Sequence, residues 1–415
     1  MGRAKENILA LVLAAGKGTR MISDVPKVLH EIHGKPLLGH VLDVLGRSGI
    51  KKTVVVAGHG ESEVRSFIEN QAQVVRQVPQ LGTGHAVLCA KKALSKWQGS
   101  LLVIPGDAPC VNAETIKQLI SEHQRECAAA SILTAVIDNP HGYGRIVRKN
   151  GKVVGIREEL DASDEERLIR EVNSSIYLFD VKLLLKHLDR LKSDNQKREY
   201  YLTDVVESFV RSDLKVIGVE ASEASEVFGI NSRADLAKVN RVMNLKEIEK
   251  HQKAGVTILS PENTFIGPDV KIGKDTVVRP FSWIEKNVTI GKKCSIGPFA
   301  TIRETSVIDD GAIVGCYVEV VRSRIGKNAK VKHLAYLGDA SLGEDVNIGA
   351  GTITANFDGS KKHKTIIGKK TFIGSNTVLI APVKIGSKAK TGAGAVVLSN
   401  SRIKDCEIFV GVTAK

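Results

Sequence analysis

The chain has 415 residues, of which 26% are charged and 42% hydrophobic, and its formal net charge is +14. This length exceeds what one hydrophobic core usually serves, so we expect at least two domains, and no apolar run approaches the roughly 18 residues that a membrane span requires. The basic excess favours acidic partners, but nucleic acid is not expected, because only 4% of residues are aromatic and rings for base stacking are scarce.

The cysteines and the amino-terminal segment predict the cellular compartment. The six cysteines are scattered without CxxC spacing, which favours reduced thiols over disulfides or zinc ligands. The start MGRAKENILALVLAAGKG superficially resembles a leader peptide. Its apolar run continues directly into a glycine-rich loop, however, and no separate cleavage site follows, so we expect a cytoplasmic protein.

The first predicted element is a buried parallel strand at 8–13, and a glycine-rich loop follows it at once. Gly16 and Gly18 would let the backbone approach a ligand, and exposed N–H groups could hold phosphate oxygens. Cations follow in and just after the loop: Lys17, Arg20 and Lys27. The spacing fits neither the Walker nor the dinucleotide pattern. The loop predicts a nucleotide-phosphate site, with a plain tight turn as the alternative.

Strand-like and helix-like segments alternate from residue 6 to about 230. We expect strands at 53–57 and 101–105 and helices at 38–45, 62–69 and 113–127. This rhythm predicts a sheet with helices on both faces, in which ligands bind beyond the carboxyl ends of the strands.

Several motifs in this region resemble those of a known family. GKGTRM at 16–21 with PKVL at 26–29 resembles the signature of sugar-nucleotide pyrophosphorylases. QVPQLGTGH at 77–85, EYYLTD at 199–204 and FGINSR at 228–233 are similar to motifs of the bacterial bifunctional uridyltransferase–acetyltransferases. The resemblance implies an α/β nucleotidyltransferase domain with a Rossmann-like mixed sheet, which makes UDP-N-acetylglucosamine from UTP and N-acetylglucosamine 1-phosphate.

The resemblance assigns roles position by position. UTP would be bound by Leu13, Ala14, Ala15, Gly16, Lys27, Gln77, Gly82 and Thr83, with Arg20 and Lys27 as the catalytic cations. The acetylamino sugar would be bound by Gly144, Glu158 and Asn173. Asp107 and Asn231 would bind Mg²⁺, and Asn231 would also contact the substrate. EYYLTD would support the sugar pocket.

The residue types alone leave other readings open at these positions. Gln77 and Thr83 suit a base edge, but they would also suit a polar turn. Asp107 follows an apolar strand and could hold Mg²⁺, yet an aspartate in this position is more often a helix N-cap or a turn residue. Asn231 could belong to a capping segment before Ser232. The family also has a lysine where Leu160 stands, and NTG where this chain has NSS at 173–175.

A linker helix and a second domain follow. Residues 232–254 predict one helix that is capped by Ser232 and ended by Gly255. We therefore expect a pyrophosphorylase domain at 1–231, a linker helix at 232–255 and a further domain at 256–415.

The second domain has a hexapeptide pattern. Aliphatic residues recur every six positions from Ile266 to Val397, with a phase slip before Ile325 and an interruption at 355–365 that should project outward. Such repeats build a parallel β-helix with aliphatic side chains stacked inward, here in six to seven coils. The resemblance to left-handed β-helix acyltransferases implies the hand of the helix and a homotrimer with the active site between subunits.

HLAYLGDA at 333–340 and NIGAGTITAN at 347–356 match the acetyltransferase half of the same family. A neutral imidazole can take a proton from an amine, although a histidine outside the repeat can also be a plain surface residue. The resemblance makes His333 the base that acts on glucosamine 1-phosphate. Arg303, Tyr336, Asn347 and Lys362 would bind the sugar phosphate. Acetyl-CoA would be bound by Ala350, whose amide would stabilise the oxyanion, and by Asn356, Phe357, Ser375 and Ala393.

This half departs from the family pattern. Val321 stands where the family has a lysine that contacts the sugar phosphate, and we expect the adjacent Arg322 to point to the opposite face of a strand. Cys316 and Phe357 replace Asn and Tyr, and the chain stops at Lys415 without the family's basic tail.

The predicted function is therefore bifunctional: acetylation of glucosamine 1-phosphate, then uridyl transfer that yields UDP-N-acetylglucosamine for peptidoglycan and cell wall synthesis. One alternative keeps nucleotidyl transfer alone, with a β-helix that serves oligomerisation or regulation or acts on another amino sugar. The other is a non-catalytic assembly subunit.

Overall fold

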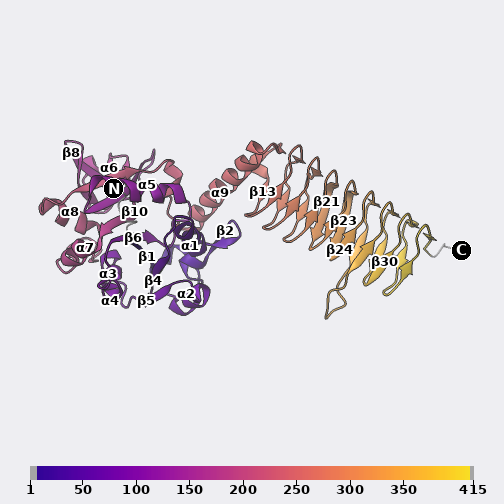
Figure 1. Cartoon of the computed structure of the whole chain (residues 1–415), viewed down its shortest axis with the longest axis horizontal. Coiled ribbons are helices and arrows are strands. Elements are labelled where there is room, and N and C mark those ends of the chain that lie inside the picture. The colour runs from indigo at the N-terminus through magenta and orange to yellow at the C-terminus, as the bar shows by residue number, and fades with distance from the viewer. Residues whose placement is uncertain (1–6, 412–415) are drawn as a thin grey trace. The chain divides into compact units, whose positions relative to one another are not determined.

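The computed structural model describes residues 7–411, so the first six residues of the leader-like start at 1–18 and the chain end at 412–415 fall outside it. The chain divides into two compact units, 1–240 and 241–415, within helix α9 (Arg233–Lys253). Figure 1 shows a sheet flanked by helices in the first unit and a prism of short strands in the second. The fold class expected from the sequence is confirmed.

The first unit is built on a mixed sheet with the strand order β11-β7-β10-β6-β1-β4-β5. The strands are β1 (Ile8–Ala14), β4 (Lys52–Ala57), β5 (Gln73–Arg76), β6 (Ser100–Pro105), β7 (Ala130–Val136), β10 (Glu171–Asp180) and β11 (Val216–Glu220). Only β10 runs antiparallel to its neighbours β6 and β7 on this path. The carboxyl ends of β1, β4 and β6 therefore meet at one edge of the sheet.

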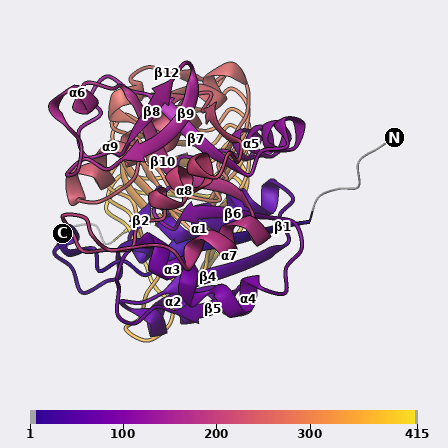
Figure 2. The same ribbon diagram turned by 90° about the vertical axis from the view of Figure 1, so that its left-hand side faces the viewer.

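Helices cover both faces of this sheet because alternate residues of its strands face opposite ways. Ala10 and Val12 of β1 belong to one apolar core, whereas Leu9 and Leu11 belong to the other. The first core also contains residues of α1 (Leu37–Arg47), α2 (Glu61–Ile68) and α5 (Ala113–Glu126). The second contains residues of α3 (Thr83–Cys89), α7 (Val181–Leu188) and α8 (Thr203–Arg211). Figure 2 shows this layered unit from the side that faces left in Figure 1.

Smaller elements complete the unit. Two hairpins, β2–β3 (Glu31–Ile32 and Lys35–Pro36) and β8–β9 (Arg145–Lys149 and Lys152–Arg157), and the short helices α4 (Lys91–Leu94) and α6 (Asp164–Arg167) lie between the main elements. The strands and helices predicted up to residue 127 are confirmed, and their observed ends differ from the predicted ones by one or two residues.

The second unit is a parallel β-helix with three faces, which we call A, B and C. Face A contains β12 (Thr257–Ile258), β15 (Val277–Val278), β18 (Ser295–Ile296), β25 (Asn347–Ile348), β28 (Phe372–Ile373), β31 (Lys390–Thr391) and β34 (Ile408–Phe409). Face B contains β13 (Phe265–Ile266), β16 (Trp283–Ile284), β19 (Thr301–Ile302), β26 (Ile353–Ala355), β29 (Val378–Ile380) and β32 (Val396–Val397). The long strands β21 (Ile313–Val321) and β23 (Lys330–Gly338) pair with strands of both faces.

Face C contains the remaining strands of the prism. They are β14 (Lys271–Ile272), β17 (Thr289–Ile290), β20 (Val307–Ile308), β22 (Arg324–Ile325), β24 (Ala340–Leu342), β27 (Thr365–Ile367), β30 (Val383–Ile385) and β33 (Arg402–Ile403). The aliphatic positions of the hexapeptides point inward and stack: Ile284, Ile302 and Val320 are fully buried one above another on face B.

Two details of the prism differ from or add to the prediction. Nine strands succeed one another on face A, from β12 to β34, so the prism has eight coils and not the six to seven expected. The predicted repeat ran only from Ile266 to Val397, so it left out β12, β33 and β34. The interruption leaves the prism as a loop between β26 and β27, closed by a bridge between Phe357 and Lys362 (Figure 1). Among residues 7–411, no helix has both the length and the apolar character needed to cross a bilayer.

Candidate functional site

The predicted nucleotide-site residues lie around one cavity of about 730 Å³ in the first unit, at the carboxyl ends of β1 and β6. The cavity is lined by Leu13, Ala14, Ala15, Gly16, Arg20, Lys27, Gln77, Gly82, Thr83, Asp107, Gly144, Glu158, Asn173 and Asn231. These residues come from loops and strand ends far apart in the sequence. The sheet brings them together because its parallel strands end at a common edge.

The glycine-rich loop leaves β1 at this edge and exposes its polar groups. Gly16, Lys17 and Arg20 are exposed, which leaves them free to meet a ligand. Gly18 adopts φ 61°, and a Cβ there would lie only 2.8 Å from Cβ of Lys27. Glycine is therefore required for both the turn and the close packing of Lys27.

Lys27 joins the two residues that the sequence analysis assigned to a metal. Its ammonium group donates to the carboxylate of Asp107, and its Nζ lies 3.2 Å from Oδ1 of Asn231. The side chains of Lys27 and Asp107 are only 16% and 15% exposed, so solvent screens this pair weakly. Two oxygen ligands from distant segments thus converge on one cation. That Lys27 bridges them was not predicted from the sequence.

Other residues fill the capping roles left open for Asp107 and Asn231. The side chain of Asn112 caps α5 by accepting a hydrogen bond from the amide of Thr115 at 2.8 Å. At the start of α9, Oγ of Ser232 accepts from the amide of Asp235 at 3.1 Å. The side chains of Asp107 and Asn231 are consequently available to the cavity.

The residues present fit Mg²⁺ of the kind held by substrate as well as by protein. Among residues 7–411, no group of three or more His, Cys, Asp or Glu side chains could enclose a metal ion. Mg²⁺ commonly binds one or two protein oxygens and completes its shell with water and phosphate oxygens. One carboxylate and one amide oxygen, beside a loop that can hold phosphates, match that pattern.

The segment 77–85 is held rigidly against the rest of the unit. Gln77 is only 3% exposed, and its amide nitrogen donates to the carbonyl of Gly82 at 3.0 Å. A Cβ on Gly82, whose φ is 104°, would lie 2.7 Å from the carbonyl oxygen of Tyr200. The hydroxyl of Thr83 accepts from the amide of Leu202 at 3.0 Å. The EYYLTD motif therefore packs against this segment and supports it. The absence of a side chain at Gly82 lets the backbone of Tyr200 approach closely, so this glycine serves packing within the chain.

The opposite wall contains the residues predicted to bind a sugar. Asn173 donates to the hydroxyl of Tyr177 at 2.7 Å and accepts from the amide of Ser175 at 3.0 Å. Burial raises the pKa of Glu158, whose carboxylate accepts from the hydroxyl of Thr203 at 3.3 Å. This wall offers hydrogen bonds but few charges, which suits a neutral sugar.

The cavity also contains residues that the sequence analysis did not assign. Its lining includes Gln80, Tyr143, Ser174, Glu199 and Asp235. Glu199 belongs to the EYYLTD motif, which was given only a supporting role. Asp235 lies in the first turn of α9, and its carboxylate accepts a hydrogen bond from the backbone amide of Asn231 at 3.1 Å. It therefore fixes the segment that presents Asn231.

On the prism, several predicted residues form one column at the corner between faces A and B. Cys316 lies in register with His333 on the next coil. Further along the prism, the carbonyl of Ala350 accepts a hydrogen bond from the amide of Asn376 at 2.7 Å. The carbonyl of Ser375 accepts one from the amide of Gly394, also at 2.7 Å. His333, Ala350, Ser375 and Ala393 therefore succeed one another coil by coil. His333 is exposed and accessible to a substrate.

A second group lies on face B and at its far corner. Tyr336 is in register with Glu319, which accepts from Nε of Arg303 at 2.7 Å. Asn356, Phe357 and Lys362 belong to the loop that leaves the prism beside this face. Asn347 is different, because it lies on face A, in register with Lys330 and Phe372. One copy of the prism does not bring Asn347 together with Tyr336.

The expectation for Arg322 assumed that it lies on a strand, and that premise is wrong. β21 ends at Val321, which is only 6% exposed, and Arg322 has φ 46° and lies in the corner that follows. The rule that neighbouring side chains point to opposite faces holds only within a strand, so it does not apply here.

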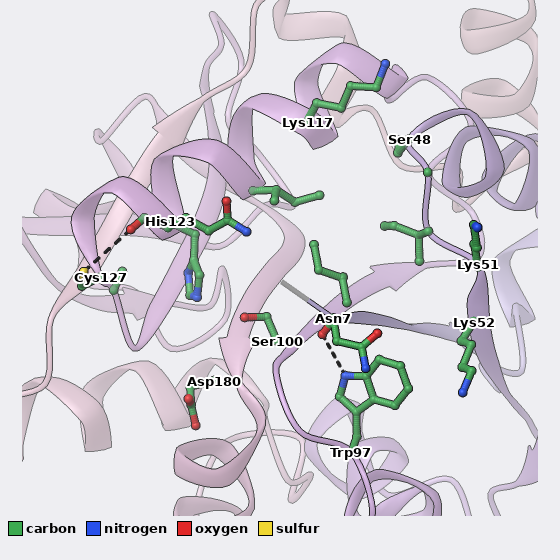
Figure 3. A pocket seen from close by; sticks show the side chains of 16 residues that line it. Asn7, Ser48, Lys51, Lys52, Trp97, Ser100, Lys117, His123, Cys127 and Asp180 are labelled. Carbon is green, nitrogen blue, oxygen red and sulfur yellow. Dashed lines mark hydrogen bonds between the residues drawn. The ribbon is translucent and has the colours of Figure 1, made fainter. Parts of the chain in front are cut away.

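A larger hollow, of about 1100 Å³, lies where β1, β4 and β6 begin, at the other edge of the same sheet (Figure 3). Asn7, Lys52 and Trp97 line it, with Nζ of Lys52 5.2 Å from the ring centroid of Trp97. None of the predicted site residues lines this hollow. Ligands of such sheets bind at the carboxyl ends of strands, so the smaller cavity is the candidate site.

Three family models match the chain. The MobA-like NTP transferase domain matches residues 10–201. The GMPPB C-terminal domain matches residues 260–366, and the bacterial transferase hexapeptide (six repeats) matches residues 364–399. Each of these matches lies within one of the two units of the structure.

Whole-length relatives carry the name bifunctional protein GlmU. One from Fervidobacterium nodosum is 44% identical over 420 residues, covering 93% of this chain and 91% of the relative. One from Streptococcus mutans is 41% identical over 428 residues, covering 94% and 92%. One from Clostridium perfringens is 43% identical over 425 residues, covering 94% and 93%.

Proposed function

The chain belongs to the family of bifunctional GlmU proteins, and from this premise we propose that each unit carries one transferase activity. The first unit joins UTP and N-acetylglucosamine 1-phosphate into UDP-N-acetylglucosamine, a precursor for cell wall synthesis. The prism transfers the acetyl group of acetyl-CoA to glucosamine 1-phosphate. The observation that supports the first activity is that the side chains of Asp107 and Asn231 both contact the ammonium group of Lys27, beside the glycine-rich loop.

The chemistry of uridyl transfer follows from this arrangement. A phosphate oxygen of the sugar attacks the α-phosphorus of UTP, and the bond to the β-phosphate breaks to release pyrophosphate. The loop amides, Arg20 and Lys27 position the triphosphate and offset its charge, so catalysis is mostly positioning and electrostatics. Asp107 and Asn231 would hold Mg²⁺, which neutralises further phosphate charge. Gln77 and Thr83 would meet the uracil, and Gly144, Glu158 and Asn173 the acetylamino sugar.

Acetyl transfer requires a base and an oxyanion donor on the prism. His333 takes a proton from the attacking amine, and the amide of Ala350 donates to the thioester oxygen as its negative charge develops. The thioester bond breaks, and coenzyme A leaves as a thiol. Ser375 and Ala393 continue the column along which acetyl-CoA would lie, with Asn356 and Phe357 at the loop.

A homotrimer would complete this second site. Asn347 lies on face A, whereas Tyr336 lies on face B, so a neighbouring copy must bring the two kinds of residue together if both bind one sugar phosphate. Phe281, Phe299 and Tyr317 form an exposed stack at the corner between these faces, with centroids 4.9 and 5.1 Å apart, which is suited to contact with another copy. The substrates UTP and acetyl-CoA, and the free cysteines, fit a cytoplasmic protein.

Two assays on the purified chain test the proposal. Pyrophosphate release from UTP, N-acetylglucosamine 1-phosphate and Mg²⁺ reports the first activity, and a panel of other NTPs and sugar phosphates reports its specificity. Thiol release from acetyl-CoA with glucosamine 1-phosphate reports the second. Val321 favours the alternative in which only the first activity exists, and thiol release no faster than without the amino sugar would establish that alternative. If the chain had neither activity, the hypothesis of a non-catalytic assembly subunit would remain.

A further inference from the structure

We propose that Arg322 is the residue that binds the phosphate group of the acceptor amino sugar on the prism. The proposal rests on the proposed acetyl transfer and adds a phosphate ligand to that site. It rests on the position of Arg322, which a shortened coil turns toward the candidate residues on face B and in the loop beside it.

The shortened coil explains the position of Arg322. Equivalent residues of regular coils are 18 apart, as with Ser387 and Asp405, but Arg322 and Asp339 are 17 apart. This coil is therefore one residue shorter than a regular coil, which accounts for the phase slip before Ile325. Arg322 and Asp339 both adopt positive φ, 46° and 51°, and the amide of Asp339 donates to the carbonyl of Val321 at 3.0 Å. The two side chains therefore stand one above the other at the same corner.

Asp339 orients the guanidinium group of Arg322. Nε and Nη2 of Arg322 each donate to a carboxylate oxygen of Asp339 at 2.8 Å, and the amide group of Asn356 donates to Oδ2 of Asp339 from the next coil. Hydrogen bonds from Arg322 and Asn356 lower the pKa of Asp339, so the carboxylate stays charged. A guanidinium group has five N–H donors, and this pair uses two of them. Among residues 7–411, Arg322 has no further hydrogen-bond partner.

The residues around this corner form an anion-binding arrangement. A Cβ on Gly338 would lie 2.7 Å from both the hydroxyl of Tyr336 and the amide nitrogen of Asn356, so these polar groups flank the corner. The positive charge of Lys362 acts on Asp339 as well, which places a second cation nearby. Arg322 and Lys362 carry two positive charges and Asp339 one negative charge, so the net charge of the three side chains is +1. A preoriented guanidinium with spare donors beside a lysine suits a phosphate group.

Arg324 provides a matched control on the same prism. It also forms a two-point ion pair, with Nε and Nη2 lying 3.0 and 2.8 Å from the carboxylate oxygens of Asp309. It lies on face C, however, away from Tyr336 and Asn356. Arg324→Ala thus removes the same kind of side chain and the same kind of pair without touching the proposed site.

The test measures thiol release from acetyl-CoA by the full chain and by Arg322→Ala, Arg322→Lys and Arg324→Ala. We expect Arg322→Ala to raise the KM for glucosamine 1-phosphate about tenfold to a hundredfold, which is the range of a charge-assisted hydrogen bond, with Arg322→Lys between it and the wild type. The KM for acetyl-CoA and the rate of pyrophosphate release should change less than about twofold. Arg324→Ala should behave as the wild type does.

A truncated acceptor isolates the phosphate. With glucosamine, which has an amine but no phosphate, Arg322→Ala and the wild type should acetylate equally slowly. The proposal is overturned if the variant loses as much with glucosamine as with its phosphate, if Arg324→Ala has the same defect, or if Arg322→Ala has none. A wild-type chain that releases no thiol overturns the proposed acetyl transfer itself, which is a different and recognisable result.

Discussion

Substituting Asp107 by Asn tests the division of labour between the two units. The change keeps the shape of the side chain and removes one negative charge where Lys27 and, in the proposed reaction, a divalent cation meet. Asn231 still offers its oxygen to Lys27, so the fold should tolerate the change. Uridyl transfer should nevertheless fall steeply, because the cation that organises the triphosphate loses its one carboxylate ligand.

The size of the loss can be worked from the charges. At about 4 Å and an effective dielectric constant of about 20, a unit charge and a divalent cation interact by about 8 kcal/mol. The unit charge of Lys27 competes for the same carboxylate, which offsets about 4 kcal/mol of that. The remaining ~4 kcal/mol corresponds to a loss of about 10³-fold in kcat/KM.

The assay compares pyrophosphate release with thiol release in the same preparation, and circular dichroism checks the fold. Asp43→Asn serves as the control, because Asp43 pairs with Lys35 on the exposed surface of the same unit, where its loss should cost little. Asp107→Asn should lose uridyl transfer and keep acetyl transfer. If the folded variant keeps a tenth or more of its uridyl transfer, or loses both activities equally, the reasoning is refuted.

Three further changes probe the rest of the chain. Ile302→Ala removes a fully buried side chain from the prism core and should lower the free energy of unfolding by about 2–5 kcal/mol in urea titrations, whereas an unchanged midpoint would contradict the inward stacking. His333→Ala should slow thiol release at least about 100-fold and leave pyrophosphate release intact; a smaller effect would remove His333 as the base. Burial and neighbouring carboxylates raise the pKa of Asp204 to about 6, so its charged form destabilises the fold above that pH. Asp204→Asn should therefore raise the free energy of unfolding by about 1 kcal/mol at pH 7.5, after allowance for solvent screening, and the gain should disappear as the pH falls through 6 to below 4; a gain that persists at low pH would refute this cause.

The periodic parts of the fold could be predicted from the sequence. The alternating segments of the first unit and the six-residue repeat of the second each bury one face at a fixed period, so the residues themselves specify the elements. The strand-end position of the candidate site was also predictable, because ligands of open α/β sheets bind there. The roles of the individual residues at that site remain predictions.

Features that depend on pairing between distant segments could not be predicted. The bridge from Lys27 to Asp107 and Asn231 joins residues up to 204 positions apart, and no local pattern encodes it. The placement of Arg322 depends on where a strand ends and a corner begins. The sequence showed the phase slip, but only the structure shows that the slip aligns Arg322 with Asp339. The hollow shown in Figure 3 likewise has no sequence motif.

The most direct test of the account is a crystal structure of the chain with UTP and Mn²⁺, in which anomalous scattering locates the metal. We expect a metal peak between the side-chain oxygens of Asp107 and Asn231, with the triphosphate on the glycine-rich loop and the ammonium group of Lys27 moved from Asp107 to phosphate. Nucleotide in the hollow at the amino ends of the strands, or a metal that contacts neither Asp107 nor Asn231, would contradict it.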